Sequence, residues 1–141
     1  MRSATAAALD AGAILVFVGI GRSAHTDGVS VAGMASTAWP FLTGAAIGWV
    51  ASRAWRRPAA LVPSGTATWI ATVAVGMVLR VVSGQGTAAA FVVVALAFLG
   101  AELLGWRTVV RVATARRSGA TLGRAVASTV RPTRSPSAGR A

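Results

Sequence analysis

Apolar residues occur in four long runs, separated by shorter polar or glycine-rich stretches. Each run is close to the about 20 residues that an α-helix needs to cross the hydrocarbon core of a membrane. Backbone groups in lipid have to hydrogen-bond to one another, which a helix achieves within a single segment. The pattern therefore predicts an all-α integral membrane bundle of four transmembrane helices, at residues 4–21, 37–55, 65–83 and 86–106.

The second run allows two starting points. A start at Val31 places Pro40 in the helix interior, where proline removes a hydrogen bond and kinks the helix. A start at Thr37 places Pro40 in the first turn, where its missing N–H is harmless. The later start also separates Trp39 and Trp55 by about 24 Å at about 1.5 Å per residue, which suits one tryptophan at each membrane interface. We therefore expect this helix to begin at Thr37.

The composition changes after the fourth run. Residues 107–117 are expected to extend the fourth helix along the membrane surface. Residues 118–141 are rich in Ser, Thr, Gly, Pro and Arg, have little to bury, and are expected to be disordered. The predicted domains are thus a transmembrane domain, 1–107, and an Arg-rich juxtamembrane segment with a disordered basic C-terminal tail, 108–141. Its arginines either hold anionic lipid or only fix the topology.

The charge is as uneven as the hydropathy. Hydrophobic residues make up 55% of the chain and charged residues 12%, and 14 arginines face three acids, for a net charge of +11. Such a balance is typical of proteins that bind nucleic acid or an anionic membrane surface. The arginines flank apolar runs and do not alternate with exposed aromatic residues, so we expect a lipid bilayer as partner and no nucleic acid.

The distribution of arginines predicts the orientation. With four crossings, Arg2, the three arginines of residues 53–57 and the eight that follow the fourth run share one side, against Arg22 and Arg80 on the other. Cytoplasmic segments carry the excess of arginine in membrane proteins. We expect a multi-pass protein of the plasma (inner) membrane with both termini cytoplasmic.

Ionisable residues within membrane helices cost about 2.5–3.5 kcal/mol each at the helix centre. Asp10 and Glu102 lie at similar depth in the cytoplasmic half and form an inner polar layer with Arg53 and Arg107, which are in reach of the cytoplasmic surface. Arg80 lies near the outer end of the third helix. Two explanations remain open. The acids pair with nearby arginines and fix the helix packing, or Asp10 and Glu102 form a proton- or cation-binding pair in a transport path.

A second polar group is expected at the outer end, where Arg22, His25 and Asp27 follow the first run at the level of Arg80. If His25 or Asp27 contacts Arg80, these residues form a polar cap; otherwise the first helix simply ends in water. A lone histidine in such a stretch is more typical of a solvated loop. A triad of Ser23 with His25 and Asp27 is excluded as a local unit, because residues two apart do not converge in the required geometry.

Small residues recur at helical spacing. Gly44 and Gly48 form a G-x-x-x-G motif on the second helix, and Gly76 lies on one face of the third with Thr72 and Arg80. Such positions let helix backbones approach closely in lipid. Packing within one bundle and assembly into a homo-oligomer explain the motif equally well.

Motifs of catalysis and cofactor binding are missing. The sequence has no P-loop, no G-x-S-x-G and no complete dinucleotide-binding loop. It has no cysteine and one histidine, which excludes thiolate sites and the usual multi-histidine metal sites within one chain. We expect no enzyme, no catalytic residue, no cofactor and no metal.

Five segments in order, GRSAH, TAWPFLTGAAIGW, TWIATVAVGMVLR, GTAAAFVVVA and LLGWR, make residues 10–107 resemble the small actinobacterial membrane proteins of the family named domain of unknown function 3054. The resemblance implies four membrane helices in the plasma membrane and no particular reaction. Among functions, the sequence favours transport of a small solute or ion by an oligomer. The alternative is a non-transporting scaffold or accessory subunit that binds a protein partner or anionic lipid through its Arg-rich tail.

Overall fold

The computed structural model describes residues 1–23 and 30–129, with the backbone alone for residues 125–128. Most of these residues belong to four long helices: α1 (Ser3–Ser23), α2 (Val31–Ser52), α3 (Thr66–Val82) and α4 (Ala89–Thr129). Two short turns, η1 (Ala54–Arg56) and η2 (Leu61–Gly65), connect α2 to α3. No strand occurs in these described ranges, so the all-α prediction is confirmed.

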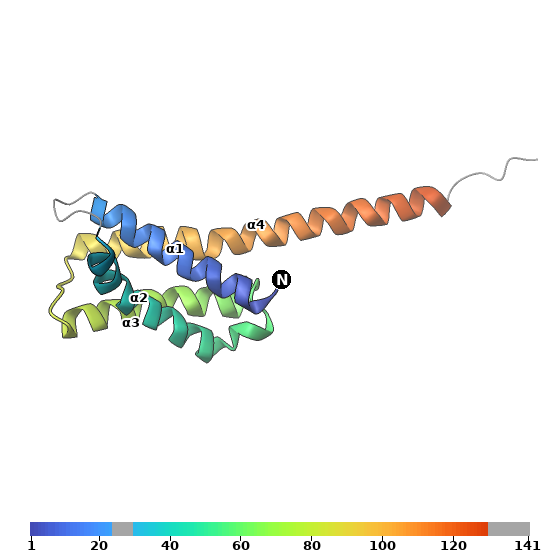
Figure 1. The fold of residues 1–141 in the computed structure, drawn as a ribbon. Coiled ribbons are helices and arrows are strands. Elements are labelled where there is room, and N and C mark those ends of the chain that lie inside the picture. Colours follow the sequence, from blue (N-terminus) through green and yellow to red (C-terminus); the bar gives the residue numbers. More distant parts are fainter. Residues whose placement is uncertain (24–29, 130–141) are drawn as a thin grey trace, which may run out of the picture. The chain divides into compact units, whose positions relative to one another are not determined.

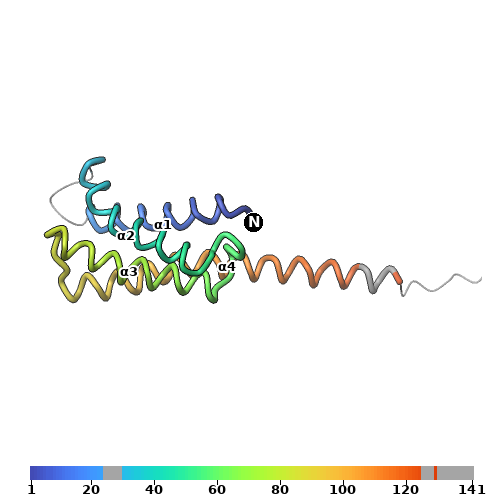
Figure 2. Tube along the Cα trace, turned by 90° about the horizontal axis from the view of Figure 1, so that it is seen from below, coloured from blue at the N-terminus to red at the C-terminus, as the bar shows by residue number. Residues whose placement is uncertain are grey.

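The chain divides into two units, Met1–Val110 and Arg111–Ala141. In the first unit, α1, α2, α3 and the first part of α4 lie alongside one another as a bundle (Figure 1, Figure 2). The second unit contains the rest of α4. The division after Val110 lies close to the predicted boundary at residue 107.

Three helical stretches of the described residues are long and apolar enough to cross a membrane: Ser3–Ser23, Leu61–Val82 and Ala89–Arg124. The remaining helix, α2, has 22 residues but contains Pro40, three glycines and four hydroxyl residues. It does not belong to the apolar set. The bundle therefore has the predicted number of long helices, and the crossing of the membrane by α2 stays a prediction.

The expected start of the second helix was wrong, because α2 begins at Val31 and not at Thr37. Ser30 caps the helix: its side-chain oxygen accepts a hydrogen bond from the Gly33 N–H at 3.1 Å. A serine in this position satisfies one of the backbone donors that the first turn leaves open. The helix also ends before residue 55, at Ser52.

Pro40 consequently lies inside α2, where it cannot donate a hydrogen bond to the carbonyl four residues earlier. That carbonyl belongs to Ser36, and it accepts a hydrogen bond from Gln85 Nε2 at 3.0 Å. The side chain of Gln85 thus replaces the backbone donor that proline lacks. Figure 2 shows that α2 changes direction in its first half, as an interior proline causes.

The prediction of disorder from residue 118 onward was also wrong for residues 118–129, since α4 continues to Thr129. This stretch contains Ala, Leu and Arg, which favour helices, and the next proline of the chain is Pro132. A low apolar content therefore did not prevent helix formation here. Residues 130–141 of the predicted tail lie outside the described residues.

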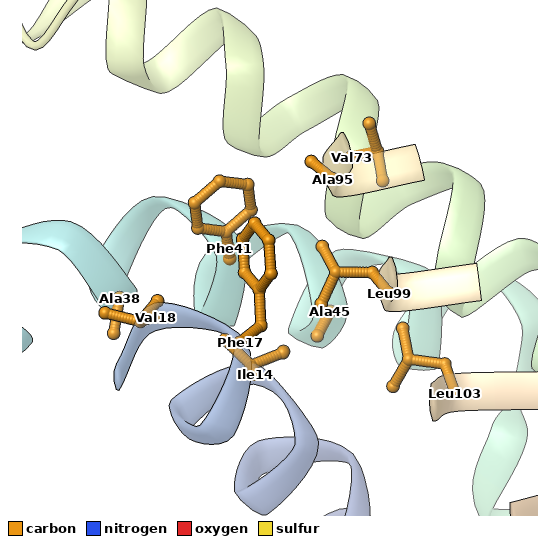
Figure 3. Packing of buried hydrophobic residues seen from close by; sticks show 10 residues of the cluster. All are labelled: Ile14, Phe17, Val18, Ala38, Phe41, Ala45, Val73, Ala95, Leu99 and Leu103. Atoms are coloured by element: carbon orange, nitrogen blue, oxygen red, sulfur yellow. The ribbon is translucent and has the colours of Figure 1, made fainter. Parts of the chain in front are cut away.

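The bundle core is built around the four phenylalanines of the chain. Phe17 of α1 meets Phe41 of α2 edge to face, with ring centroids 5.5 Å apart and an interplanar angle of 88°. Phe91 and Phe98 of α4 lie 6.0 and 5.7 Å from Phe17. Figure 3 shows the surrounding buried residues, which come from all four helices: Ile14, Val18, Ala38, Ala45, Val73, Ala95, Leu99 and Leu103. Apolar side chains thus occupy the middle of the bundle.

Candidate functional site

A buried ion pair joins the beginning of α1 to α4. The Arg107 guanidinium donates from Nη1 to Asp10 Oδ1 and from Nη2 to Asp10 Oδ2, each at 2.7 Å. Asp10 is 2% exposed and Arg107 is fully buried. Two parallel bonds of this kind fix the orientation of both groups, because the planar guanidinium matches the carboxylate.

Two tryptophans complete the surroundings of the carboxylate. Trp49 Nε1 of α2 donates to Asp10 Oδ2 at 2.8 Å, and Trp106 Nε1 of α4 donates to Asp10 Oδ1 at 2.9 Å. Each carboxylate oxygen thus accepts two hydrogen bonds, which uses the about four acceptor sites that a carboxylate offers. We call Asp10, Trp49, Trp106 and Arg107 the Asp10 cluster.

Arg107 also binds the backbone around it. Its Nε donates to the Pro58 carbonyl at 3.2 Å, and its Nη1 donates to the Leu103 carbonyl at 2.6 Å. The Pro58 contact ties the connection between α2 and α3 to α4. Gly65 leaves room for the arginine stem, because a Cβ at this position would lie 2.9 Å from Arg107 Cδ.

The structure does not join Asp10 to Glu102 as the predicted cation-binding pair, because the partners of Asp10 are Arg107 and the two tryptophans. Arg107, and not Arg53, neutralises the acid. Glu102 lies on α4, partly exposed, and its buried Oε2 has no hydrogen-bond partner among the described residues. A saturated, neutralised carboxylate at Asp10 is suited to holding helices together and has no acceptor left for a cation.

The opposite end of the bundle holds a different polar group. Arg80 Nη1 donates to Gln85 Oε1 at 2.9 Å, and Gln85 Nε2 donates to the Ser36 carbonyl at 3.0 Å. The Arg80 guanidinium carbon also lies 4.7 Å from the centroid of the Phe91 ring, a cation–π distance. We call Arg80, Gln85 and Ser36 the Gln85 bridge; it connects α3 and the loop that follows it to α2.

The predicted cap is described only in part. Arg22 Nη1 donates to Thr37 Oγ1 at 3.2 Å, which links the end of α1 to α2. His25 and Asp27 lie outside the described residues. Their predicted contact with Arg80 therefore stays a prediction.

The small residues of α2 and α3 lie at close helix contacts within the chain. A Cβ on Gly44 would lie 2.6 Å from the Ala71 carbonyl oxygen, and one on Gly48 would lie 2.6 Å from Thr68 Cα. A Cβ on Gly76 would lie 2.7 Å from the Phe41 ring. The G-x-x-x-G motif of α2 therefore packs against α3, which leaves it unavailable as a contact between two copies.

Among residues 1–23 and 30–129, no three His, Cys, Asp or Glu side chains gather in a way that could hold a metal ion.

The model of one protein family matches residues 7–110, which is most of the chain. Its description reads Protein of unknown function (DUF3054). The chain belongs to this family. Searches of curated proteins and of solved structures found no match.

The family match ends where the first structural unit ends, at residue 110. The Asp10 cluster and the Gln85 bridge thus both lie in the part that defines the DUF3054 family. The Arg-rich residues 111–141 lie beyond the match.

The sequence analysis missed three side chains of these groups, since it did not single out Trp49, Trp106 or Gln85. Gln85 is the only glutamine of the chain, and an amide in an otherwise apolar or glycine-rich stretch needs hydrogen-bond partners. The indole N–H of a buried tryptophan also needs a hydrogen-bond acceptor. An acid on a neighbouring helix could therefore have been predicted as that acceptor.

Proposed function

We propose that the chain is a four-crossing protein of the plasma membrane with both termini cytoplasmic. The antiparallel packing of α1 and α2 supports the crossing by α2: Asp10, early in α1, meets Trp49, late in α2, and Arg22, late in α1, meets Thr37, early in α2. A helix packed along its length against an apolar spanning helix shares its depth. The excess of arginines on the side of the Asp10 cluster supports the orientation.

The cysteine-free sequence offers a direct test of this topology. Single substitutions Ala88→Cys, in the loop before α4, and Ser118→Cys, in the Arg-rich part of α4, change exposed positions. A membrane-impermeant thiol reagent should label Ala88→Cys in intact cells and Ser118→Cys only after lysis. The opposite labelling would reverse the orientation, and labelling of both in intact cells would remove one crossing.

For the molecular role, we propose a non-transporting membrane component, without enzymatic activity, that binds anionic lipid through the Arg-rich part of α4. The observation that supports this proposal is a positive charge that no acid compensates. Arg111, Arg116, Arg117 and Arg124 are exposed, and residues 111–141 contain no acid. Basic residues near an anionic membrane surface contribute about 1 kcal/mol each. The filled core and the saturated Asp10 cluster further favour a role other than conduction through one bundle.

This role predicts a lipid-dependent change in the second unit. In nanodiscs with phosphatidylglycerol, backbone amides of residues 111–129 should exchange hydrogen more slowly than in nanodiscs of phosphatidylcholine. Replacing Arg116, Arg117 and Arg124 by Gln should remove the difference, as should high salt. Ser118→Ala, between these arginines, is the matched control that keeps the charge. Equal exchange in both lipids for the unaltered chain would contradict the proposal.

A second candidate is proton or cation transport by an oligomer, and the observation that favours it is Glu102. Its Oε2 is buried without a hydrogen-bond partner among the described residues, on a helix apolar enough to cross a membrane. An unpaired carboxyl in a membrane is costly, so a second copy or a bound cation would stabilise it. Proteoliposomes should then show proton or cation flux that Glu102→Gln abolishes. No flux above empty vesicles would reject this candidate.

A further inference from the structure

An apolar groove runs between α1 and α2 beside the Asp10 cluster. Its volume is about 370 Å³, within the about 300–1,000 Å³ typical of ligand pockets. Small side chains make the groove: Ala7 and Ala11 on α1 face Ala45 and Ala46 on α2. From Leu42 to Val50 it follows α2 for about 12 Å at about 1.5 Å per residue.

Asp10 contributes to the lining of this groove but does not make it acidic. Arg107 neutralises the carboxylate, and all four of its acceptor positions are occupied. A cationic or hydrogen-bond-donating group of a ligand would therefore find no free acceptor on Asp10. The groove therefore suits a hydrocarbon chain.

One end of the groove carries positive charge. Trp55 lines that end and is 49% exposed, and it stands in the chain between Arg53 and the pair Arg56 and Arg57. The side chains of these three arginines are exposed. Of the two acids among the described residues, Asp10 is committed to Arg107 and Glu102 lies on α4. Three uncompensated guanidinium groups next to an amphipathic indole match an anionic headgroup.

We infer that the α1–α2 groove, with Arg53, Arg56 and Arg57 at its end, binds one anionic phospholipid. One acyl chain lies along the alanines of α1 and α2, and the phosphate is bound by the arginines. Trp55 lies at the boundary between the two. This site is separate from the Arg-rich part of α4, and it rests on the membrane location proposed above.

The test is a lipid titration of the purified full-length chain in detergent, followed by native mass spectrometry. Dioleoyl phosphatidylglycerol should give one strongly bound lipid, and dioleoyl phosphatidylcholine should bind far more weakly. Replacing Arg53, Arg56 and Arg57 by Gln should weaken the first phosphatidylglycerol by about fivefold per arginine, on the order of a hundredfold together. Ala7→Leu, which fills the groove, should also weaken it, whereas Ala97→Leu at an exposed position of α4 should not.

Replacing Arg116, Arg117 and Arg124 by Gln separates this inference from the proposed function. The first phosphatidylglycerol should survive that change; its loss would assign it to α4 and overturn the groove site. Unchanged binding after Ala7→Leu, or equal affinity for phosphatidylcholine, would also overturn it. Equal affinity for soluble glycerol phosphate would show that the site binds a simple phosphate ligand and not a lipid.

A measurement on the unaltered sequence guards against variants that fail to fold. Phosphatidylglycerol with brominated acyl chains should quench tryptophan fluorescence more than brominated phosphatidylcholine does. Trp49 and Trp55 both line the groove, so Trp55→Phe should reduce this difference, while Trp39→Phe, at an exposed position outside the groove, should keep it unchanged. A difference that is as large in Trp55→Phe as in the unaltered chain would contradict the placement of the lipid.

Discussion

The Asp10 cluster and the Gln85 bridge lie at opposite ends of one bundle and hold their helices by different means. The cluster joins α1, α2 and α4 through a charged, almost fully buried pair whose carboxylate accepts four hydrogen bonds. The bridge joins α2 and α3 through a single amide, part of it exposed, that serves a backbone carbonyl. A buried charge needs all of its hydrogen bonds, whereas loss of the amide removes the bonds of one partly exposed side chain to the Ser36 carbonyl and to Arg80 Nη1.

This difference implies that the two ends fail differently when they are mutated. Removing one member of the cluster leaves a buried charge without its partner. Removing the amide of the bridge leaves the Ser36 carbonyl without its donor and Arg80 Nη1 without its acceptor. Stability should therefore be concentrated at the Asp10 end.

The largest effect is expected for Asp10→Ala. It leaves the fully buried Arg107 without a counter-charge and should lower the free energy of unfolding by about 3–5 kcal/mol. The measurement is thermal and denaturant unfolding of the purified chain in detergent, followed by tryptophan fluorescence. Asp10→Leu combined with Arg107→Met should recover much of the loss, because the double variant contains no uncompensated charge. A double variant less stable than Asp10→Ala would refute this account.

Trp49→Phe tests how much of the cluster depends on its neutral donors. The ring is kept, but Asp10 Oδ2 loses the indole bond of 2.8 Å, which should cost about 1.5–3 kcal/mol because the acceptor is charged. Trp69→Phe is the matched control. It removes an indole bond to the Leu96 carbonyl at 3.0 Å, a neutral acceptor, and should cost about 0.5–1.5 kcal/mol. Equal losses for the two variants would show that the charge of Asp10 adds nothing.

Gly48→Ala tests whether the tight packing beside the Asp10 cluster contributes as much to stability as the charge of the cluster does. The new Cβ would lie 2.6 Å from Thr68 Cα and has no flexible side chain to displace, so we expect a loss of about 1–3 kcal/mol. In Gly105→Ala the added methyl meets nothing within 4 Å, and the helix should gain slightly in stability. Unfolding of both variants in detergent gives the comparison. An unchanged free energy of unfolding in Gly48→Ala would mean that α2 and α3 can move apart at little energetic cost.

Much of the fold follows from hydropathy, because an α-helix needs about 17–25 predominantly apolar residues to cross a membrane, and the four apolar runs have about this length. The start of α2 and the end of α4 were misplaced for reasons that hydropathy does not record. Pro40 was expected near a helix start, yet it is tolerated inside α2 because Gln85, 45 positions away in the chain, supplies the missing donor. The end of α4 depends on helix propensity in a segment with little to bury.

The candidate site shows the same limit. Depth along a helix predicted Asp10 and Arg107 in one polar layer. One of the two explanations, that the acids pair with nearby arginines and fix the packing, matches the geometry found at Asp10. Depth alone could not separate Glu102 from Asp10, because it does not tell which face of α4 turns toward α1. That choice depends on how Trp106 and Arg107 both reach one carboxylate, which is a property of the assembled bundle.

The smallest expected effect, in the Gln85 bridge, is also the most specific. Gln85→Ala removes the donor to the Ser36 carbonyl and the acceptor of Arg80 Nη1. Because Arg80 and Gln85 are both partly exposed, we expect a cost of about 0.5–1.5 kcal/mol in unfolding experiments. Pro40→Ala restores a backbone N–H four residues after Ser36, and this N–H can bond to the same carbonyl. In the Pro40→Ala background, Gln85→Ala should therefore cost less, and the coupling between the two positions should be about 0.5 kcal/mol or more.

Val78→Ala, at an exposed position of α3, should give the same change in both backgrounds. Additive effects of Pro40→Ala and Gln85→Ala would mean that the Gln85 amide stabilises the bundle through Arg80 alone. The amide would then not replace the backbone hydrogen bond that Pro40 lacks, and the proposed difference between the Gln85 bridge and the Asp10 cluster would be wrong.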